Sequence, residues 1–279
     1  MTWQLRTRTL HFSSRPLLMG IVNVTPDSFS DGGRFLKSAA AIEYAQQLVA
    51  EGADLIDIGG ESTRPRAQPV SEQEELDRVL PVIESVCKTA NIPVSIDTSK
   101  ASVASAAVAA GAEIINDITA LRGDAEMLNV VCESGAAICV MHMQGTPQTM
   151  QIDPQYDDVV QEVFEFLRDV RDRLISAGMV PARICLDPGI GFGKTPQHNL
   201  AILANGWRLH ELGCPVLVGH SRKSFLSYVV GDESADRTAA GIGVACALAS
   251  QDVQILRVHD VAAVRQALTL FDAVSNCRD

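Results

Sequence analysis

The sequence predicts a single-domain (β/α)8 barrel, the TIM-barrel class of α/β protein, with a short N-terminal β arm. Eight short apolar runs alternate with helical patterns, and glycine recurs where a helix should end before the next strand. The chain has 279 residues, the usual length of one such barrel. No Gly-x-Gly-x-x-Gly follows the first strand and no linker interrupts the chain. We therefore expect one domain over residues 1–279, with the barrel itself over about residues 17–273.

The predicted strands are near-continuous runs of Val, Ile and Leu, which is typical of parallel strands buried on both faces. They are Leu17–Val24, Ala53–Gly59, Pro93–Asp97, Glu113–Ile118, Ala136–His142, Ile184–Asp187, Pro215–His220 and Ile255–Asp260. Before them, residues 1–12 alternate polar and apolar residues, which favours a short hairpin that closes the floor of the barrel.

Helical patterns separate these strands. The clearest are Ala39–Glu51, Ser71–Thr89, Ala101–Ala110 and Tyr156–Ala177. Ser71 and Glu74 have the spacing of a capping box. Five helix-to-strand joints carry a glycine, which suits the left-handed residue that follows a helix: Gly52, Gly111, Gly135, Gly178 and Gly213.

The overall charge limits the partners. The net charge is −11 and the isoelectric point is about 5.0, which argues against binding to nucleic acid or to anionic membranes. No apolar stretch has the length of a signal peptide or a membrane span. The seven cysteines lie mostly in apolar runs and show no metal-ligand spacing, as expected of a protein of the reducing cytoplasm.

Three polar residues end predicted strands and are the first candidates for a site. Asp97, Asn116 and Asp187 each follow an apolar run, and buried carboxylates need hydrogen-bond partners. In a barrel, the C-terminal ends of the strands carry the active site. Two carboxylates and an amide around one cavity suit a flat heterocycle such as a guanine-like or pterin ring. The alternative is that they are structural residues that tie strands to loops.

Cations gather at other strand ends. Arg64, Lys223 and Arg257 follow three different predicted strands, and His259 accompanies Arg257. In an acidic chain this grouping predicts recognition of an anion, and barrel enzymes often bind phosphate near strands seven and eight. The alternative for each cation is a solvated surface charge.

Two loops complete the predicted site. The segment from Thr25 to Arg34, around Phe29, has the composition of an active-site loop. Gly189, Gly191 and Gly193 would let the chain pass close to a ligand and leave Phe192 exposed as an aromatic face. The other histidines, which we expect to be structural or at the surface, are His11, His142, His198 and His210.

Taken in order, these segments resemble the dihydropteroate synthases of the folate pathway. The resemblance covers residues 19 to 260. Its motifs are Met19–Gly33 (MGIVNVTPDSFSDGG), Gly59–Pro65 (GGESTRP), Ser95–Thr98 (SIDT), Ile115–Asp117 (IND), Asp187–Lys194 (DPGIGFGK), Ser221–Ser224 (SRKS) and Arg257–Asp260 (RVHD).

The resemblance implies a Mg²⁺-dependent transferase that joins 4-aminobenzoate to (7,8-dihydropterin-6-yl)methyl diphosphate and releases diphosphate. It also implies a homodimer and a target of sulfonamides. By motif, Asp97, Asn116, Asp187 and Lys223 would hold the pterin, and Thr63, Arg257 and His259 the diphosphate. Arg64, Pro65, Phe192, Ser224 and Phe29 would shape the aminobenzoate site, and Asn23 would contact the metal. Asp97, Lys223 and Arg257 would be catalytic.

One position departs from the family pattern, since Arg66 stands where the family usually has glycine. This change would alter the loop or tune sulfonamide binding. Two alternatives remain. The first is a methyltetrahydrofolate methyltransferase, which the Thr63-Arg64 loop and the Arg257-His259 pair argue against. The second is a non-catalytic pterin-binding paralogue, which should have lost loop or diphosphate residues.

Overall fold

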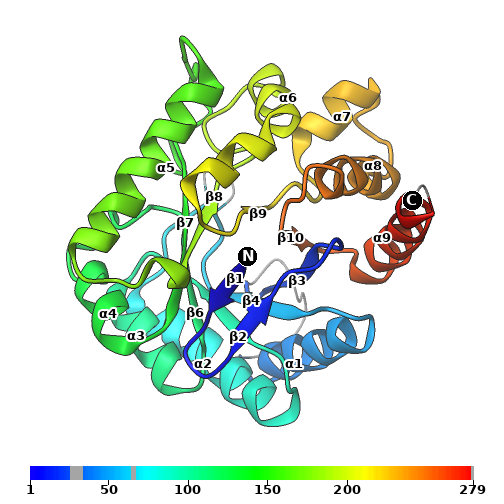
Figure 1. The fold of residues 1–279 in the computed structure, drawn as a ribbon. Coiled ribbons are helices and arrows are strands. Elements are labelled where there is room, and N and C mark those ends of the chain that lie inside the picture. The colour runs from blue at the N-terminus through cyan, green and yellow to red at the C-terminus, as the bar shows by residue number, and fades with distance from the viewer. Residues whose placement is uncertain (26–33, 64–66, 278–279) are drawn as a thin grey trace.

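The computed structural model describes residues 1–25, 34–63 and 67–277, with residues 34–37 described by their backbone alone. Eight parallel strands form a ring in the order β8-β7-β6-β5-β4-β3-β10-β9, and a bridge between Leu186 and Val216 links its two ends (Figure 1). Their bounds are β3 Leu17–Asn23, β4 Leu55–Gly59, β5 Val94–Asp97, β6 Ile114–Asp117, β7 Ala137–Met141, β8 Ile184–Asp187, β9 Leu217–Val218 and β10 Ile255–Val258. All eight predicted strands are confirmed, although β9 is much shorter than predicted.

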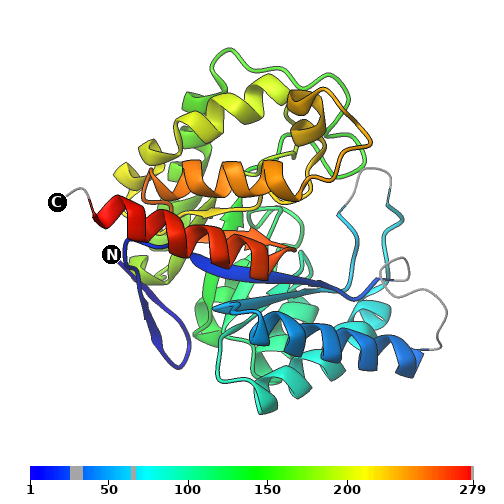
Figure 2. The same cartoon turned by 90° about the vertical axis from the view of Figure 1, so that its right-hand side faces the viewer.

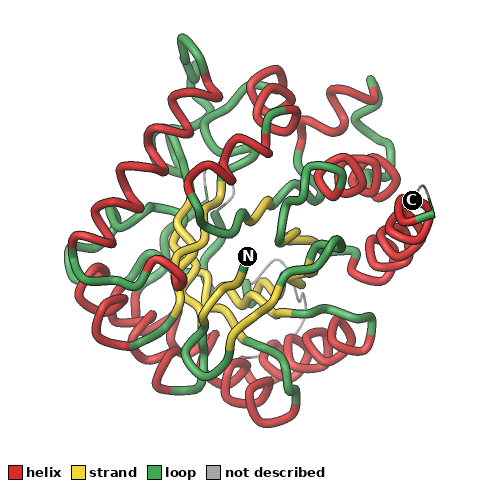
Figure 3. Tube along the Cα trace, in the orientation of Figure 1, coloured by secondary structure: helices red, strands yellow, loops and turns green. Residues whose placement is uncertain are grey.

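Helices surround the strands, as Figure 3 shows. They are α1 Arg34–Ala50, α2 Glu72–Thr89, α3 Ala101–Ala109, α4 Met127–Ser134, α5 Val159–Ser176, α6 Pro196–Ala204, α7 Ser224–Val230, α8 Thr238–Ala249 and α9 Val261–Asn276, with 3₁₀ turns at Pro181–Arg183 and Gly206–Leu212. None of these described helices is long and apolar enough to cross a membrane.

The predicted helix ends agree with the structure in part. All five joint glycines adopt a left-handed conformation, with φ between +71° and +120°. The predicted capping box is only half right. Ser71 accepts a hydrogen bond from the backbone N–H of Glu74 at 3.2 Å, but the Glu74 side chain pairs with Arg78 on the next turn instead of returning to the cap.

The N-terminal arm closes the floor of the barrel. Strands β1 (Thr2–Gln4) and β2 (Thr9–His11) form an antiparallel hairpin at the end of the barrel where the strands begin (Figures 1 and 2). Trp3 is fully buried and donates its indole N–H to the carbonyl of Arg183 at 3.0 Å. Glu113 accepts from the backbone and hydroxyl of Thr7 and pairs with Arg8 at 2.9 Å. The predicted arm is therefore confirmed.

Candidate active site

The polar side chains of the barrel mouth follow from the two-residue repeat of a strand. Leu55 belongs to the apolar cluster inside the barrel, so Asp57, two residues later on β4, also points inward. Ile56 and Ile58 face the helices. The same alternation brings further polar residues inward above the apolar floor. They are Asp97 on β5, Asn116 on β6, Asp187 on β8 and Arg257 on β10.

Arg257 joins two carboxylates from across the barrel. Its Nε donates to Asp57 Oδ2 at 2.6 Å, and its Nη2 donates to Asp97 Oδ2 at 2.8 Å. The amide of Asn116 donates to the same Asp57 oxygen at 3.1 Å. The structure thus brings together the predicted residues Asp97, Asn116 and Arg257. It adds Asp57, whose carboxylate was not among the residues predicted from the sequence.

Asp57 could have been found from its position in the sequence. It is a charged residue inside the strand Leu55–Gly59, whose members are all buried, and it is fully buried itself. A buried charge needs a partner, and Arg257 provides it. The second oxygen, Oδ1, has no hydrogen-bond partner among the described residues, which leaves an acceptor inside the barrel.

Burial changes the proton affinities of the predicted carboxylates. Burial raises the pKa of Asp97 to about 7, against the opposing effect of Arg257. Burial also raises the pKa of Asp187 to about 6, although the Gly189 N–H that donates to its Oδ1 at 2.7 Å stabilises the anion. Arg257 keeps its charge, because the carboxylates around it outweigh its own desolvation and raise its pKa. Such perturbed groups lying together at one end of a barrel are typical of a functional site.

Lys223 lies against the loop that follows β8. Its Nζ is 4.0 Å from the centre of the Phe192 ring, a cation–π contact. A side chain at Gly191 would meet Lys223 Cδ at 3.0 Å, so the glycine makes room for the lysine. Burial, followed by the charge of Arg257, lowers the pKa of Lys223 to about 8.

The expectation that Phe192 is exposed is wrong. Only 8% of this residue is exposed, because its ring packs in a cluster with Ile118 and with three methionines of β7 and the loop that follows it. The glycines around it allow this loop to pack closely against neighbouring parts of the chain, and not against a ligand. A side chain at Gly189, where φ is +69°, would fall 1.9 Å from the carbonyl oxygen of His142. A flat aromatic face remains, but it is offered to Lys223 and not to open solvent.

Beneath this loop lies a buried lysine that was not predicted from the sequence. Lys194 is 3% exposed; its Nζ lies 2.9 Å from His142 Nδ1 and donates to the carbonyl of Phe192 at 3.0 Å. Burial lowers its pKa to about 7 and that of His142 to about 2. The structural role predicted for His142 fits this buried position.

The remaining predicted residues surround this centre. His259 is held by Ser221, whose Oγ lies 3.1 Å from its Nδ1, and burial lowers its pKa to about 4. Ser224 is exposed at the first position of α7, directly after Lys223. Thr63 is partly exposed shortly after β4. Three predicted aminobenzoate residues, Phe29, Arg64 and Pro65, lie outside the described residues, as does Arg66.

Asn23, the predicted metal contact, lies at the mouth of the barrel, and its role stays a prediction. It ends β3 beside Gly59 of β4, and no hydrogen bond of its side-chain amide occurs among the described residues. The same residues contain no group of three or more His, Cys, Asp or Glu that could hold a metal alone. Mg²⁺ usually keeps several waters and takes few protein ligands together with substrate phosphates. A lone amide oxygen at the mouth is compatible with that preference.

Comparisons with known proteins agree with this geometry. A model of the family described as pterin binding enzyme matches residues 19–259. The dihydropteroate synthase of Escherichia coli (strain K12) is 41% identical over 266 residues, which cover 95% of this chain and 94% of that protein. The solved structure of the Yersinia pestis dihydropteroate synthase with a sulfonamide drug complex has a TM-score of 0.92 at 43% identity and covers 99% of this chain and 100% of its own. That of the Xanthomonas albilineans enzyme with 4-aminobenzoic acid has a TM-score of 0.91 at 45% identity, covering 98% of each chain.

Proposed function

The chain belongs to the pterin-binding enzyme family, among the dihydropteroate synthases, and from this premise we propose how its residues divide the reaction. The enzyme is a transferase of folate biosynthesis that condenses 4-aminobenzoate with (7,8-dihydropterin-6-yl)methyl diphosphate. The observation that carries the proposal is the inward cluster of Asp57, Asp97, Asn116 and Arg257. The resemblance seen in the sequence motifs is confirmed by the family and its relatives.

In the proposal, the pterin lies against the polar layer of the barrel. Asn116 and the carboxylates of Asp97 and Asp187 face the N–H groups of the ring, and Lys223 donates to its acceptors. Asp57 belongs to this set as the partner that holds Arg257 and Asn116 in place. Its free oxygen, Oδ1, gives the cavity one more acceptor.

The diphosphate binds at the rim, to Thr63, Arg257 and His259. Neutral at pH 7, His259 offers one ring N–H, and Arg257 supplies permanent positive charge. Mg²⁺, held by Asn23 with the diphosphate oxygens, would neutralise leaving-group charge. Arg257 and His259 stabilise the departing diphosphate as the bond between its oxygen and the methylene carbon breaks, and Asp97 stabilises the positive charge that develops on the pterin.

The amine of 4-aminobenzoate then forms the new C–N bond and releases a proton to water. Ser224 and the loop residues Phe29, Arg64 and Pro65 shape its site, and Phe192 contributes through the face that it presents to Lys223. No protein nucleophile is required by this sequence of bonds. Sulfonamides compete for this site in the proposal, as the complex of the Yersinia pestis enzyme with a sulfonamide drug suggests.

We also propose that residues 1–279 act as one pterin-binding barrel domain and assemble as a homodimer. Helix α8 packs against α7 and α9. Its Gly241 and Gly243 leave open space where side chains would lie, and large apolar residues of α7 and α9 are exposed. These are Tyr228, Val229, Val230, Leu270 and Val274. Light scattering should then give about twice the chain mass of 29.9 kDa, and Val230→Asp should reduce it to the monomer.

The proposed location is the cytoplasm. All seven cysteines lie within the described residues, and none forms a disulfide there. The proposal includes small-molecule substrates and no nucleic-acid or membrane partner, since the net charge of −11 disfavours both polyanions.

A coupled assay for diphosphate release tests the function. Purified protein receives Mg²⁺, the pterin diphosphate and 4-aminobenzoate, and the measurement is repeated with Lys223→Ala. Release should require both substrates and fall steeply in the variant. Pterin binding without release would favour the non-catalytic paralogue. Methyl transfer from methyltetrahydrofolate would favour the methyltransferase.

A further inference from the structure

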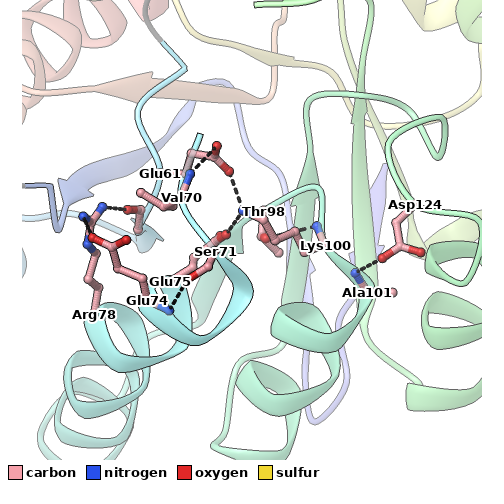
Figure 4. A network of polar contacts seen from close by, with 11 residues as sticks. Glu61, Val70, Ser71, Glu74, Glu75, Arg78, Thr98, Lys100, Ala101 and Asp124 are labelled. Carbon is pink, nitrogen blue, oxygen red and sulfur yellow. Dashed lines mark hydrogen bonds and ion pairs between the residues drawn. The ribbon is translucent and has the colours of Figure 1, made fainter. Parts of the chain in front are cut away.

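A buried ion cluster lies beside the proposed site and has no part in the chemistry above. The ammonium group of Lys100, at the start of α3, pairs with Glu75 of α2 and with Glu61, which follows β4, at 2.5 Å (Figure 4). Glu75 is fully buried, and Lys100 and Glu61 are 19% and 23% exposed. Glu61 and Glu75 belong to one βα unit, β4 with α2, and Lys100 belongs to the next, β5 with α3.

Glu61 joins the two ends of one loop. Its Oε1 accepts the backbone N–H of Val70 at 3.3 Å, while its Oε2 accepts from Lys100. One carboxylate therefore connects the beginning and the end of the segment 61–70. This segment contains Thr63 and, in sequence, Arg64 and Pro65, which the proposed function places at the diphosphate and aminobenzoate sites.

Lys100 connects that loop to the pterin-facing edge of the barrel. Its backbone N–H donates to the hydroxyl of Thr98 at 3.2 Å, and the N–H of Thr98 donates to the carbonyl of Asn116 at 3.1 Å. Asp97, which holds Arg257, precedes Thr98 directly. Hydrogen bonds thus link the cluster to the strand ends that carry Asp97 and Asn116.

The chemistry of the cluster favours positioning over stability. A buried carboxylate is costly, and an ion cluster of this kind is often no more stabilising than apolar residues of similar volume. Glu75 Oε1 has no partner among the described residues, so the burial is not fully compensated. What the charges provide is a fixed geometry. At Gly60, a side chain would meet Val79 and Glu75 at 2.8 and 2.9 Å, so the strand end has no room to shift toward α2.

We propose that Lys100 is a positioning residue for the aminobenzoate site: through Glu61 it holds both ends of the segment 61–70 in a fixed relation to the edge of β5 and β6. The inference rests on the proposed function. Small displacements of a substrate-positioning group can reduce turnover many-fold without loss of fold.

The test is Lys100→Met, which keeps the length of the side chain and removes its charge. The KM for 4-aminobenzoate should rise about tenfold. The affinity for the pterin alone, followed by its fluorescence, should change less than about twofold, because Asp187 and Asn116 are untouched. Lys100→Arg keeps the positive charge and can reach both carboxylates, so its KM for 4-aminobenzoate should stay close to the wild-type value. The matched control is Lys88→Met. It breaks an exposed ion pair between Lys88 and Glu84, both on α2, and should change neither the KM for 4-aminobenzoate nor the affinity for the pterin.

Glu61→Gln gives a second test should Lys100→Met fail to fold. The amide still accepts from Val70 but loses the charge that Lys100 needs, so the KM for 4-aminobenzoate should rise about fivefold. The inference would be overturned if either folded variant kept the wild-type KM for 4-aminobenzoate. It would also be overturned if the affinity for the pterin fell as much as the affinity for 4-aminobenzoate. If the wild-type protein itself forms no dihydropteroate, the proposed function has failed instead.

Discussion

The floor and the mouth of this barrel are built on inward-facing positions of the same strands, but they differ in the polarity of the side chains there. The centre of the floor is apolar, with Trp3 of the arm packed in one cluster with Met19, Leu55 and Ile114. Two residues further along the strands, the mouth holds carboxylates and Arg257 away from water. The difference indicates that the floor stabilises the fold while the mouth keeps charges in a costly environment for chemistry.

The pKa shifts give the sign of that cost. Burial raises the pKa of Asp187 to about 6, so the native state binds this proton more tightly than the unfolded chain. The contribution of Asp187 to the free energy of unfolding therefore falls as the pH rises from about 4 to about 6, and the ionised group opposes folding above that range. Residues chosen for stability would not behave this way.

The largest expected effect is at the mouth. Asp187→Asn should lower kcat/KM for the pterin substrate by about 10²–10³-fold, because a carboxylate that meets the ring is lost. The same change should leave the melting temperature at pH 8 equal to or above that of the wild type, since a disfavoured buried charge disappears. Steady-state kinetics and thermal unfolding measure the two. A parallel loss of activity and stability would contradict the division between mouth and floor.

The opposite result is expected at the floor. Trp3→Ala should reduce the free energy of unfolding by about 3–5 kcal/mol, because it empties a fully buried site and removes the bond to Arg183. Below the melting temperature, kcat/KM should stay within about twofold of the wild type. Urea unfolding and the diphosphate assay provide both values. A variant that kept its stability but lost turnover would show that the arm acts on the chemistry.

A smaller effect is expected for the polar part of the floor. Glu113→Gln weakens the pairing with Arg8 while an amide oxygen can still accept from Thr7, so we expect a loss of about 1–2 kcal/mol. Glu84→Gln, which breaks the exposed pair with Lys88, is the control and should cost less than about 1 kcal/mol. Equal losses in the two variants would mean that burial at the floor adds nothing.

The smallest effect is the response of the mouth to alkaline pH. The pKa of Lys223 is lowered to about 8, so its positive charge is lost as the pH rises through that value. Between pH 7 and pH 8.5, the loss of charge on Lys223 should lower kcat/KM about fourfold, but Asp97, whose pKa is about 7, ionises over the same range and offsets about half of this, so the net fall should be about twofold. Lys223→Arg should abolish this alkaline decline, whatever its effect on rate. A profile that stayed flat to pH 9 in the wild type would argue against a role for the charged lysine.

The sequence alone identified the residues whose signal is local. Strand ends, joint glycines and the polar residues Asp97, Asn116 and Asp187 were found because each stands out against an apolar run. The capping box at Ser71 was half wrong because Arg78, one turn later, competes for Glu74. Exposure of Phe192 was wrong because the residues that bury it, such as Ile118, come from other loops.

The sequence by itself thus determined the order of strands and helices, the end of the barrel that carries the site, and the family. These depend on hydrophobic periodicity and on motifs, which are properties of neighbouring residues. Only the tertiary structure decided the partners: Asp57 with Arg257, Lys194 with His142, and Lys100 with Glu61. Each pair joins residues at least 39 positions apart, brought together by the pairing of strands in the barrel. A local pattern can indicate that a charge such as Asp57 is buried, but its partner is set by the tertiary arrangement of the strands.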